Sequence, residues 1–203
     1  MKIDQRPSFE IARQIQNGIF AEVGTWEGDF SYDLLKYTTC QKLFCVDPYK
    51  HFTGGEYPDG MNRLTQEEFD SKFLTVNQRF REFGPRAEFV RMESVQASTY
   101  FPENFFDFVY IDGNHDYEYV KQDIRSWWPK VKVGGWLCGD DVYSHNLEEH
   151  DKDGNVLRVW ATNSRGVPTC WGKYGSYKAV KDLEAEYQYT PIFQETQFLI
   201  QKK

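Results

Sequence analysis

The sequence predicts an α/β fold: a doubly wound, mostly parallel seven-stranded sheet with a C-terminal antiparallel hairpin. Two observations support this prediction. Short apolar runs alternate with longer segments of helical period along most of the chain, as they do where parallel strands are joined by helical crossovers. Near the C-terminal end, two apolar runs are separated by too few residues for a crossover, which favours an antiparallel pair.

Five apolar runs are expected to form the parallel strands, and two more the hairpin. Their lengths and the turn residues around them are typical of strands. In chain order the seven are GIFAEV, KLFCVD, AEFVRM, FFDFVYID, GGWLCGD, YTPIF and QFLIQ. Because ligands of such sheets bind at the carboxyl ends of the strands, the residues that end each run are the first candidates for a site.

Four segments with the helical period lie between or after these runs. The first begins near Gly28 and passes through Leu34 and Leu35, and the second opens with Thr65 and Glu68 at the spacing of a capping box. Apolar stripes mark the faces that should be buried. They are Phe69, Phe73, Val76, Phe80 and Phe83 in the second helix, Tyr117, Val120, Ile124, Trp127 and Trp128 in the third, and Val180, Leu183 and Tyr187 in the fourth.

The 203 residues are expected to form a single domain, 1–203. A polar stretch at about 142–175 lacks a regular period and carries a turn signal at Asp153-Gly154, as an inserted lid or binding element would. The four cysteines show no C-x-x-C pairing, so reduced structural thiols are expected, with a disulfide or zinc site as the open alternative.

Charge and hydropathy exclude some classes of partner. A formal net charge of −7 disfavours a nucleic-acid partner, which would require a basic surface. The sequence has no uninterrupted apolar span of roughly 18 residues and no apolar leader, so a cytoplasmic protein without a membrane partner is expected.

The turn after the first expected strand suits a ligand. In FAEVGTWEGDF, Gly24 and Gly28 let a ligand approach the backbone, and the following helix offers unpaired N–H groups to an anion. The spacing is neither the dinucleotide fingerprint nor the P-loop. Asp47 ends the second run, where a carboxylate can accept hydrogen bonds from ribose hydroxyls.

These segments resemble the class I S-adenosylmethionine-dependent methyltransferases, and among them the small O-methyltransferases that act on sugars, catechols and natural products. AEVGTWEGDFS is similar to their first motif, and FCVDPY to the ribose-binding second. FDFVYIDGNHDYEYVKQDIRSWWPKVKVGGWLCGDDV is similar to their fourth strand, the next helix and the fifth strand, and YGSYKAVKDLEAEY to the helix that follows the acceptor loop. The likeness covers nearly the whole chain and lies in the order of the motifs.

The resemblance implies a site for S-adenosylmethionine. It places Glu22, Gly24 and Gly28 at the methionine end of the cofactor, Asp47 at its ribose, and Glu93 and Ser94 beside the adenine. For Glu93 a solvated loop carboxylate is the alternative. A buried carboxylate such as Glu22 or Asp47 needs hydrogen-bond donors, which the ligand would supply.

Three carboxylates are expected to gather at two neighbouring strand ends. Asp112 closes the fourth run, and Asp140 and Asp141 close the fifth. Like charges packed together favour a bound cation, and oxygen ligands favour magnesium, manganese or calcium. In metal-dependent relatives the corresponding positions hold a divalent ion that lowers the pKa of the acceptor hydroxyl. Helix capping and loop solvation are the alternative. Many relatives carry His-Asp where this chain carries Asp-Asp, which weakens the metal prediction.

His115 stands three residues after Asp112, where catechol-type relatives carry a catalytic lysine. Imidazole titrates near neutral pH, so His115 is the predicted general base, with Asp112 also catalytic, and a surface histidine is the alternative. His145 and His150 are reserve candidates. Asn114 could position an acceptor but could not take its proton.

The function predicted from these residues is methyl transfer from S-adenosylmethionine to a hydroxyl of a small polar acceptor, a sugar or glycan, assisted by a divalent metal. Aromatic faces with polar edges suit sugar rings, and the inserted stretch supplies both. Its residues are Tyr143, Asn146, Glu148, Asp151, Trp160, Asn163, Arg165 and Trp171. The alternatives are an N-methyltransferase and a non-catalytic protein that uses the fold for binding. A homodimer is a further expectation.

Overall fold

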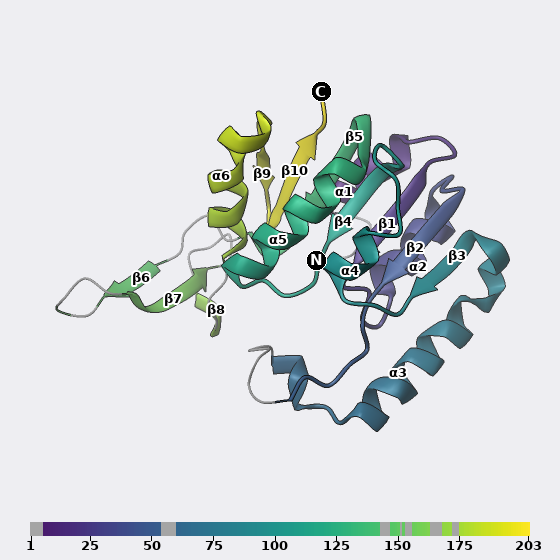
Figure 1. Ribbon diagram of the computed structural model, residues 1–203, viewed down its shortest axis with the longest axis horizontal. Coiled ribbons are helices and arrows are strands. Elements are labelled where there is room, and N and C mark those ends of the chain that lie inside the picture. Colours follow the sequence, from purple (N-terminus) through teal and green to yellow (C-terminus); the bar gives the residue numbers. More distant parts are fainter. Residues whose placement is uncertain are drawn as a thin grey trace.

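The computed structural model describes residues 6–53, 60–142, 147–150, 152, 156–162, 168–171 and 175–203. Seven strands form one sheet in the order β3-β2-β1-β4-β5-β10-β9, with helices on both faces (Figure 1). The strands are β1 (Ile19–Val23), β2 (Lys42–Val46), β3 (Ala87–Val90), β4 (Phe106–Ile111), β5 (Val131–Gly139), β9 (Ile192–Gln194) and β10 (Gln197–Gln201). The predicted sheet and its doubly wound order are confirmed.

Strand pairing follows the predicted pattern. β1, β2, β3, β4 and β5 pair in parallel, whereas β10 pairs antiparallel with both β5 and β9. The predicted C-terminal hairpin is therefore present, and it lies at one edge of the sheet. β5 begins at Val131, three residues before the predicted start, and a register shift lies in the opposing segment of β4, between Phe106 and Phe108.

Two apolar clusters fill the space on either side of the sheet. Along β1, Ala21 and Val23 belong to one cluster and Phe20 to the other, as expected when successive side chains point to opposite faces. α5 (Tyr117–Trp127) and α6 (Ser176–Tyr187) cover the first face. α1 (Pro7–Gln14), α2 (Asp29–Tyr37) and α3 (Gln66–Arg79) contribute to the second.

The predicted helix with the phenylalanine stripe is shorter than expected. Thr65 and Glu68 form the predicted capping box, but α3 ends at Arg79, and the 3-10 helix η3 (Phe80–Arg86) follows. Gly84 has a φ of +55° and Pro85 lacks an N–H, so the α-helix cannot continue through this pair. Phe80 is still buried, because the 3-10 turn keeps it against the sheet.

Several elements were not predicted. They are α1, the short α4 (Ser94–Ser98), the 3-10 helices η2 (Gly60–Arg63) and η4 (Trp128–Lys130), and a second antiparallel sheet of β6 (Leu147–His150), β7 (Val156–Thr162) and β8 (Pro168–Trp171). That sheet lies within the inserted stretch (Figure 1). The predicted turn at 153–154 lies outside the described residues.

Two expectations from composition can be compared with the structure. Cys40, Cys45 and Cys138 are buried free thiols, as expected, whereas Cys170 belongs to a strand whose side chains are not described. Within the described ranges, no helix has the length and apolar content needed to cross a bilayer.

Candidate active site

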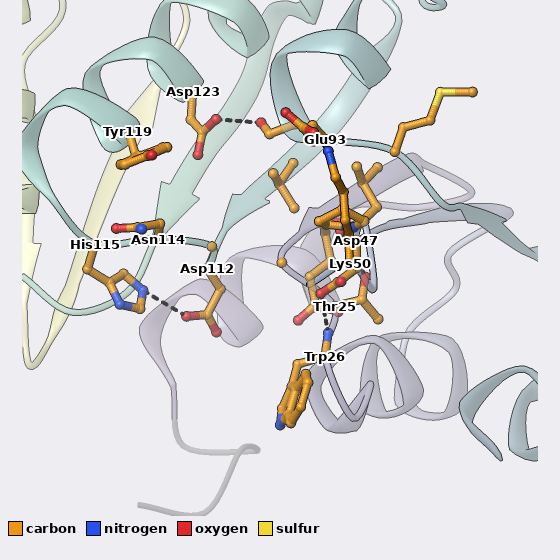
Figure 2. Close-up of a pocket in the computed structure, with 18 of the residues that line it drawn as sticks. Thr25, Trp26, Asp47, Lys50, Glu93, Asp112, Asn114, His115, Tyr119 and Asp123 are labelled. Carbon is orange, nitrogen blue, oxygen red and sulfur yellow. Dashed lines mark hydrogen bonds and ion pairs between the residues drawn. The ribbon is translucent and has the colours of Figure 1, made fainter. Parts of the chain in front are cut away.

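A cavity of about 1040 Å³ opens at the carboxyl ends of β1, β2 and β4 (Figure 2). This volume is in the range of small-molecule sites, and the position is the one expected for a doubly wound sheet. Most of the predicted site residues line it, namely Glu22, Gly24, Gly28, Asp47, Glu93, Ser94, Asp112, Asn114, His115 and Asp141. Asp140 does not line it.

Gly24 brings the end of β1 into contact with the end of β4. Its φ is +92°, and a Cβ added there would lie 2.2 Å from the carbonyl oxygen of Asp112. No other residue type fits this turn without moving β4 away. Gly28 also has a positive φ, and it starts α2 where a Cβ would meet the ring of Phe80. The two glycines therefore set the shape of the cavity wall between β1 and α2.

Asp47 joins the turn after β1 to the turn after β2. Its Oδ2 accepts a hydrogen bond from the backbone N–H of Trp26 at 2.9 Å, and its Oδ1 accepts one from that of Tyr49 at 2.8 Å. The hydroxyl of Tyr49 donates to the carbonyl of Trp26 at 2.6 Å. Both Trp26 and Tyr49 have positive φ, so Asp47 stabilises an otherwise unfavourable backbone.

Glu22 lies deeper than a surface carboxylate would. It is 2% exposed, and the hydroxyl of Ser31 donates a hydrogen bond to its Oε2. Burial raises the pKa of Glu22 well above its usual value, and the hydrogen bond from Ser31 opposes that rise. Glu22 thus lines the cavity with its carboxyl held by Ser31, at the position where the sequence predicts the methionine end of the cofactor.

Glu93 and Ser94 line the part of the cavity that follows β3, and their surroundings differ from each other. Glu93 is about half exposed and pairs with Lys50 at 2.7 Å, so the alternative of a solvated loop carboxylate describes its surroundings well. Ser94 accepts a hydrogen bond from the indole N–H of Trp127 at 2.9 Å and donates one to Asp123. Its hydroxyl is therefore fixed in place by α5.

Asp123 is a cavity residue that the sequence interpretation missed. It is 6% exposed and lines the cavity beside Ser94 (Figure 2). Burial raises its pKa to about 7, with the hydrogen bond from Ser94 opposing. A signal was present, because Asp123 lies within the apolar stripe of Val120, Ile124 and Trp127, where a carboxylate is unusual.

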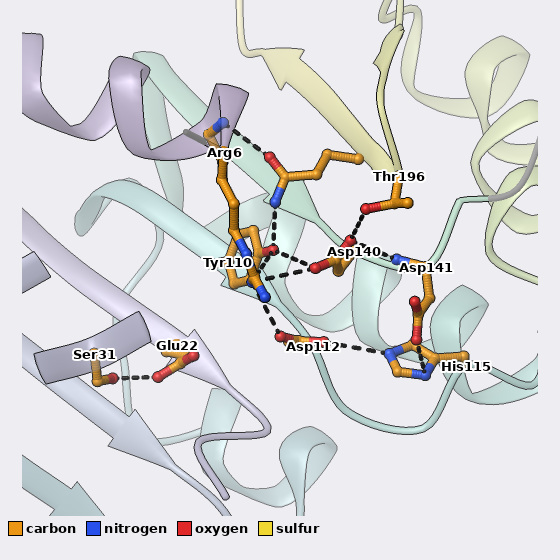
Figure 3. A network of polar contacts seen from close by, with 11 residues as sticks. Arg6, Glu22, Ser31, Tyr110, Asp112, His115, Asp140, Asp141 and Thr196 are labelled. Atoms are coloured by element: carbon orange, nitrogen blue, oxygen red, sulfur yellow. Dashed lines mark hydrogen bonds and ion pairs between the residues drawn. The ribbon is translucent and has the colours of Figure 1, made fainter. Parts of the chain in front are cut away.

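A second missed residue, Arg6, lies among the acidic residues at the opposite end of the cavity (Figure 3). Its Nη1 is 3.1 Å from Oδ2 of Asp140 and 3.7 Å from Oδ2 of Asp112. It also donates to the hydroxyl of Tyr110 at 3.0 Å. Burial would lower the pKa of Arg6, but Tyr110 and the two carboxylates raise it, so the guanidinium stays charged. No sequence motif pointed to this residue.

His115 lies between two of the predicted carboxylates. Its Nδ1 is 2.9 Å from Oδ2 of Asp141, and its Nε2 is 3.4 Å from Oδ1 of Asp112. Burial would lower the pKa of His115, but its close contacts with Asp112 and Asp141 and their negative charges raise it to about 10. At neutral pH the imidazole is therefore mostly protonated.

The predicted metal ligands Asp112, Asp140 and Asp141 do not form an open ligand set. Within the ranges that the structure describes, no group of three or more histidine, cysteine, aspartate or glutamate side chains is placed to hold a metal ion. A physical reason is that Arg6 and His115 already pair with these carboxylates. Metal binding by the three aspartates therefore stays a prediction from the sequence, and no catalytic step is derived through a metal.

Most of the residues predicted in the inserted stretch lie outside the described residues. His145, Tyr143, Asn146, Asp151, Asn163 and Arg165 lie outside the described residues. His150, Glu148, Trp160 and Trp171 belong to β6, β7 and β8, whose backbone alone is described.

The fold and the site together define the class. A sheet in this strand order, with a glycine turn after β1 and an acid after β2 beside one cavity, is the arrangement of a class I S-adenosylmethionine-dependent methyltransferase. A family model described as a methyltransferase domain matches residues 21–142, more than half of the chain, and the chain belongs to this family. The protein is therefore a methyltransferase that uses S-adenosylmethionine. No curated protein sequence matches the chain.

Solved structures with the same fold agree with this class. One, a protein from Staphylococcus aureus assigned as a caffeoyl-CoA O-methyltransferase, has a TM-score of 0.60 at 12% identity, over 97% of this chain and 82% of its own. A S-adenosylmethionine-dependent methyltransferase from Methanosarcina mazei has a TM-score of 0.56 at 12% identity, over 97% and 96%. A protein from Streptococcus mutans assigned as a methyltransferase, solved with SAH, has a TM-score of 0.55 at 9% identity, over 96% of each chain. At these identities the likeness concerns the fold.

Proposed function

We propose that the protein transfers the methyl group of S-adenosylmethionine to a hydroxyl group of a small polar acceptor, a sugar or glycan. One observation carries the proposal. A single cavity joins the glycine turn and Asp47, which suit the cofactor, to Asp112 and His115, which suit a reacting hydroxyl. The protein would accelerate the transfer mainly by aligning the acceptor oxygen, the methyl carbon and the sulfur. The assignment of the Staphylococcus aureus neighbour as an O-methyltransferase supports oxygen as the acceptor atom.

The charges at the acceptor end of the cavity support a cationic donor. Arg6 and His115 carry two positive charges, and Asp112, Asp140 and Asp141 carry three negative ones when all are ionised. One negative charge is left over, and the sulfonium of S-adenosylmethionine would balance it. On transfer the sulfonium loses its positive charge while the proton of the acceptor hydroxyl passes to a carboxylate of this group, so the charge balance of the site is kept until that proton leaves to solvent.

The proton of the acceptor hydroxyl must go to a group near the reacting oxygen. His115 is protonated over most of the neutral range, so it accepts a proton only in the small neutral fraction. Burial raises the pKa of Asp112, with the hydrogen bond to His115 opposing, which makes this carboxylate a stronger base than an exposed one. We therefore assign the proton to the Asp112–His115 pair, with Asp112 as the immediate acceptor near pH 7.

Two measurements test the proposed function. Isothermal titration with S-adenosylmethionine and its demethylated product should give one site per chain, and transfer of a labelled methyl group should occur to polyhydroxyl acceptors. Transfer confined to amines would contradict the assignment of a hydroxyl acceptor. Transfer confined to flat phenols would contradict the assignment of a sugar or glycan. Cofactor binding without transfer to any acceptor in the panel would favour a binding protein.

The proton assignment has its own test in the pH profile of kcat/KM. If Asp112 takes the proton, kcat/KM should not follow the neutral fraction of His115 between about pH 7 and pH 9. If neutral His115 is required, kcat/KM rises about tenfold per pH unit up to about pH 10, because the neutral fraction of His115 rises by that factor. The second result would assign the role of base to His115 alone.

A further inference from the structure

The acceptor end of the cavity carries a built-in cation. Arg6 directly precedes α1, and three polar contacts hold its guanidinium against Tyr110, Asp112 and Asp140 (Figure 3). Its Cζ also lies 5.4 Å from the centre of the Phe30 ring. A side chain that extends from a helix end and is held by an aromatic face and two acids is not a solvated surface arginine.

The backbone that carries Arg6 is fixed by the same network. The N–H of Ser8, in the first turn of α1, donates to Oε1 of Gln197 on β10 at 2.9 Å. The side-chain amide of Gln197 donates to the hydroxyl of Tyr110 at 2.6 Å. Tyr110 therefore links the start of α1, β4 and β10, and Arg6 is positioned by elements that are far apart in the chain.

Asp140 shows why a metal ion would find too few ligands here. Its Oδ1 accepts hydrogen bonds from the hydroxyl of Thr196 at 2.6 Å and from the N–H of Asp141 at 2.9 Å. Its Oδ2 faces Tyr110 at 3.1 Å and Arg6 at 3.1 Å. Both carboxylate oxygens are thus engaged, and Asp140 does not line the cavity. A divalent ion would have to displace the guanidinium to reach it.

We propose that Arg6 takes the place of a divalent cation at the acceptor end of this methyltransferase, so that the fixed guanidinium neutralises the strand-end carboxylates and excludes a metal ion. A guanidinium carries one positive charge and several N–H donors in a plane, so it can pair with two acids and still face an oxygen in the cavity. Where that oxygen belongs to the acceptor hydroxyl, Arg6 would stabilise the negative charge that develops on it. This last point rests on the proposed function, whereas the exclusion of metal does not.

Binding of Mn²⁺, measured by the loss of the free-ion signal in electron paramagnetic resonance, tests the proposal directly. The wild-type protein should show no saturable binding up to about 1 mM Mn²⁺. Arg6→Gln keeps a hydrogen-bond donor for Tyr110 but removes the charge, and it should bind Mn²⁺ at least tenfold more tightly. Arg13→Gln is the matched control: Arg13 lies on α1, the helix that Arg6 precedes, is about half exposed and pairs only with Glu10 in the described part of the chain, and its loss changes the net charge equally.

The possible results separate clearly. Saturable micromolar binding of Mn²⁺ to the wild-type protein, lost in Asp140→Asn, would overturn the proposal, and this measurement needs no folded Arg6 variant. Equal Mn²⁺ affinity of Arg6→Gln and the wild type would also overturn it. Titration with S-adenosylmethionine on the same samples reports on the proposed function separately. A protein that binds neither the cofactor nor Mn²⁺ would remove the methyl-transfer proposal and leave the role of Arg6 as a fixed cation intact.

Discussion

At the scale of single residues, Asp47 has a structural function that adds to the one expected for a cofactor. Each of its oxygens accepts a hydrogen bond from a backbone N–H, of Trp26 or of Tyr49. An ionised carboxylate has about four lone-pair positions, so one carboxylate can accept from ligand hydroxyls as well as from backbone N–H groups. The turn that is expected to receive the cofactor is therefore preorganised by the residue that would bind the ribose.

Replacement of Asp47 by asparagine tests whether this carboxylate binds the ribose. The amide offers one acceptor oxygen, so one backbone N–H and one ribose hydroxyl lose their partner. We expect the affinity for S-adenosylmethionine to fall by roughly 10- to 100-fold, which corresponds to one or two charged hydrogen bonds. Calorimetric titration measures it. Glu88→Gln, an exposed change on the edge strand β3, should keep the wild-type affinity. An unchanged affinity in Asp47→Asn would exclude the ribose role.

Three of the predicted site residues that line the cavity, Gly24, Asp47 and Asp112, share one property: each directly follows a strand. Gly24, Asp47 and Asp112 could be placed from sequence because parallel strands bring their carboxyl ends to one edge. Arg6 could not, since its neighbour Ser8 is held by Gln197 on β10, 189 residues further along the chain, and Arg6 itself contacts Tyr110 and Asp140. A polar residue before a short helix carries no pattern that announces such a contact.

At the scale of elements, the close approach of β1 to β4 depends on one missing side chain. A Cβ at Gly24 would lie 2.2 Å from the carbonyl oxygen of Asp112. Gly134 also has a positive φ, at +82°, but nothing lies within 4 Å of its Cβ position. The two glycines thus differ in contact while sharing a backbone conformation that disfavours other residues.

This difference gives a controlled test. Gly134→Ala should lower the free energy of unfolding by about 1–2 kcal/mol, which is the usual cost of a left-handed backbone for a residue with a Cβ. Gly24→Ala should lose clearly more, because it adds the clash with β4, and it should also lose measurable binding of S-adenosylmethionine. Urea unfolding and calorimetric titration of both variants provide the measurements. Equal losses of stability in the two variants would show that the contact with β4 does not matter.

The extent to which elements could be predicted follows the same logic. All five parallel strands and the hairpin follow from apolar runs, because burial on both faces of a sheet demands them. The end of α3 was misplaced because the phenylalanine stripe keeps its spacing through Phe80 and Phe83, although the backbone changes to a 3-10 turn there. Apolar spacing reports the buried face and not the hydrogen-bond pattern.

At the scale of the whole molecule, buried titratable groups with raised pKa values, among them Asp123 and His115, should make folding stability fall as pH rises. Asp123 has its pKa raised by burial to about 7, from an ordinary value near 3.8. The folded state therefore holds a proton that the unfolded state has released across this window. The contribution of Asp123 to the free energy of unfolding is full below about pH 4. It is lost as pH rises to 7, at up to roughly 1.4 kcal/mol per pH unit.

The variant Asp123→Asn should weaken this dependence. Its free energy of unfolding, from urea titrations at half-unit steps of pH, should decline less between about pH 5 and 7 than that of the wild type, because only the contributions of Glu22 and Asp112, whose pKa values burial also raises, are left. Asp182→Asn, which alters an exposed carboxylate of α6, is the control and should keep the wild-type decline. A wild-type slope in Asp123→Asn would mean that Asp123 is ionised throughout this range.

His115 should cause a second decline at higher pH. Its pKa is raised to about 10 by Asp112 and Asp141 against the effect of burial, from an ordinary value of 6.5. The protonated ring stabilises the folded state fully below about pH 6.5, and this contribution is lost as pH rises towards 10. The free energy of unfolding of His115→Asn, from urea titrations, should therefore decline less between pH 7 and 10 than that of the wild type.

Asp123→Asn serves here as the control. Asp123 is already ionised above about pH 8, so this variant should keep the second decline, whereas its first decline is smaller. If His115→Asn declines as steeply as the wild type, the ring is neutral at pH 7, and the assignment of the acceptor proton to Asp112 would pass to His115.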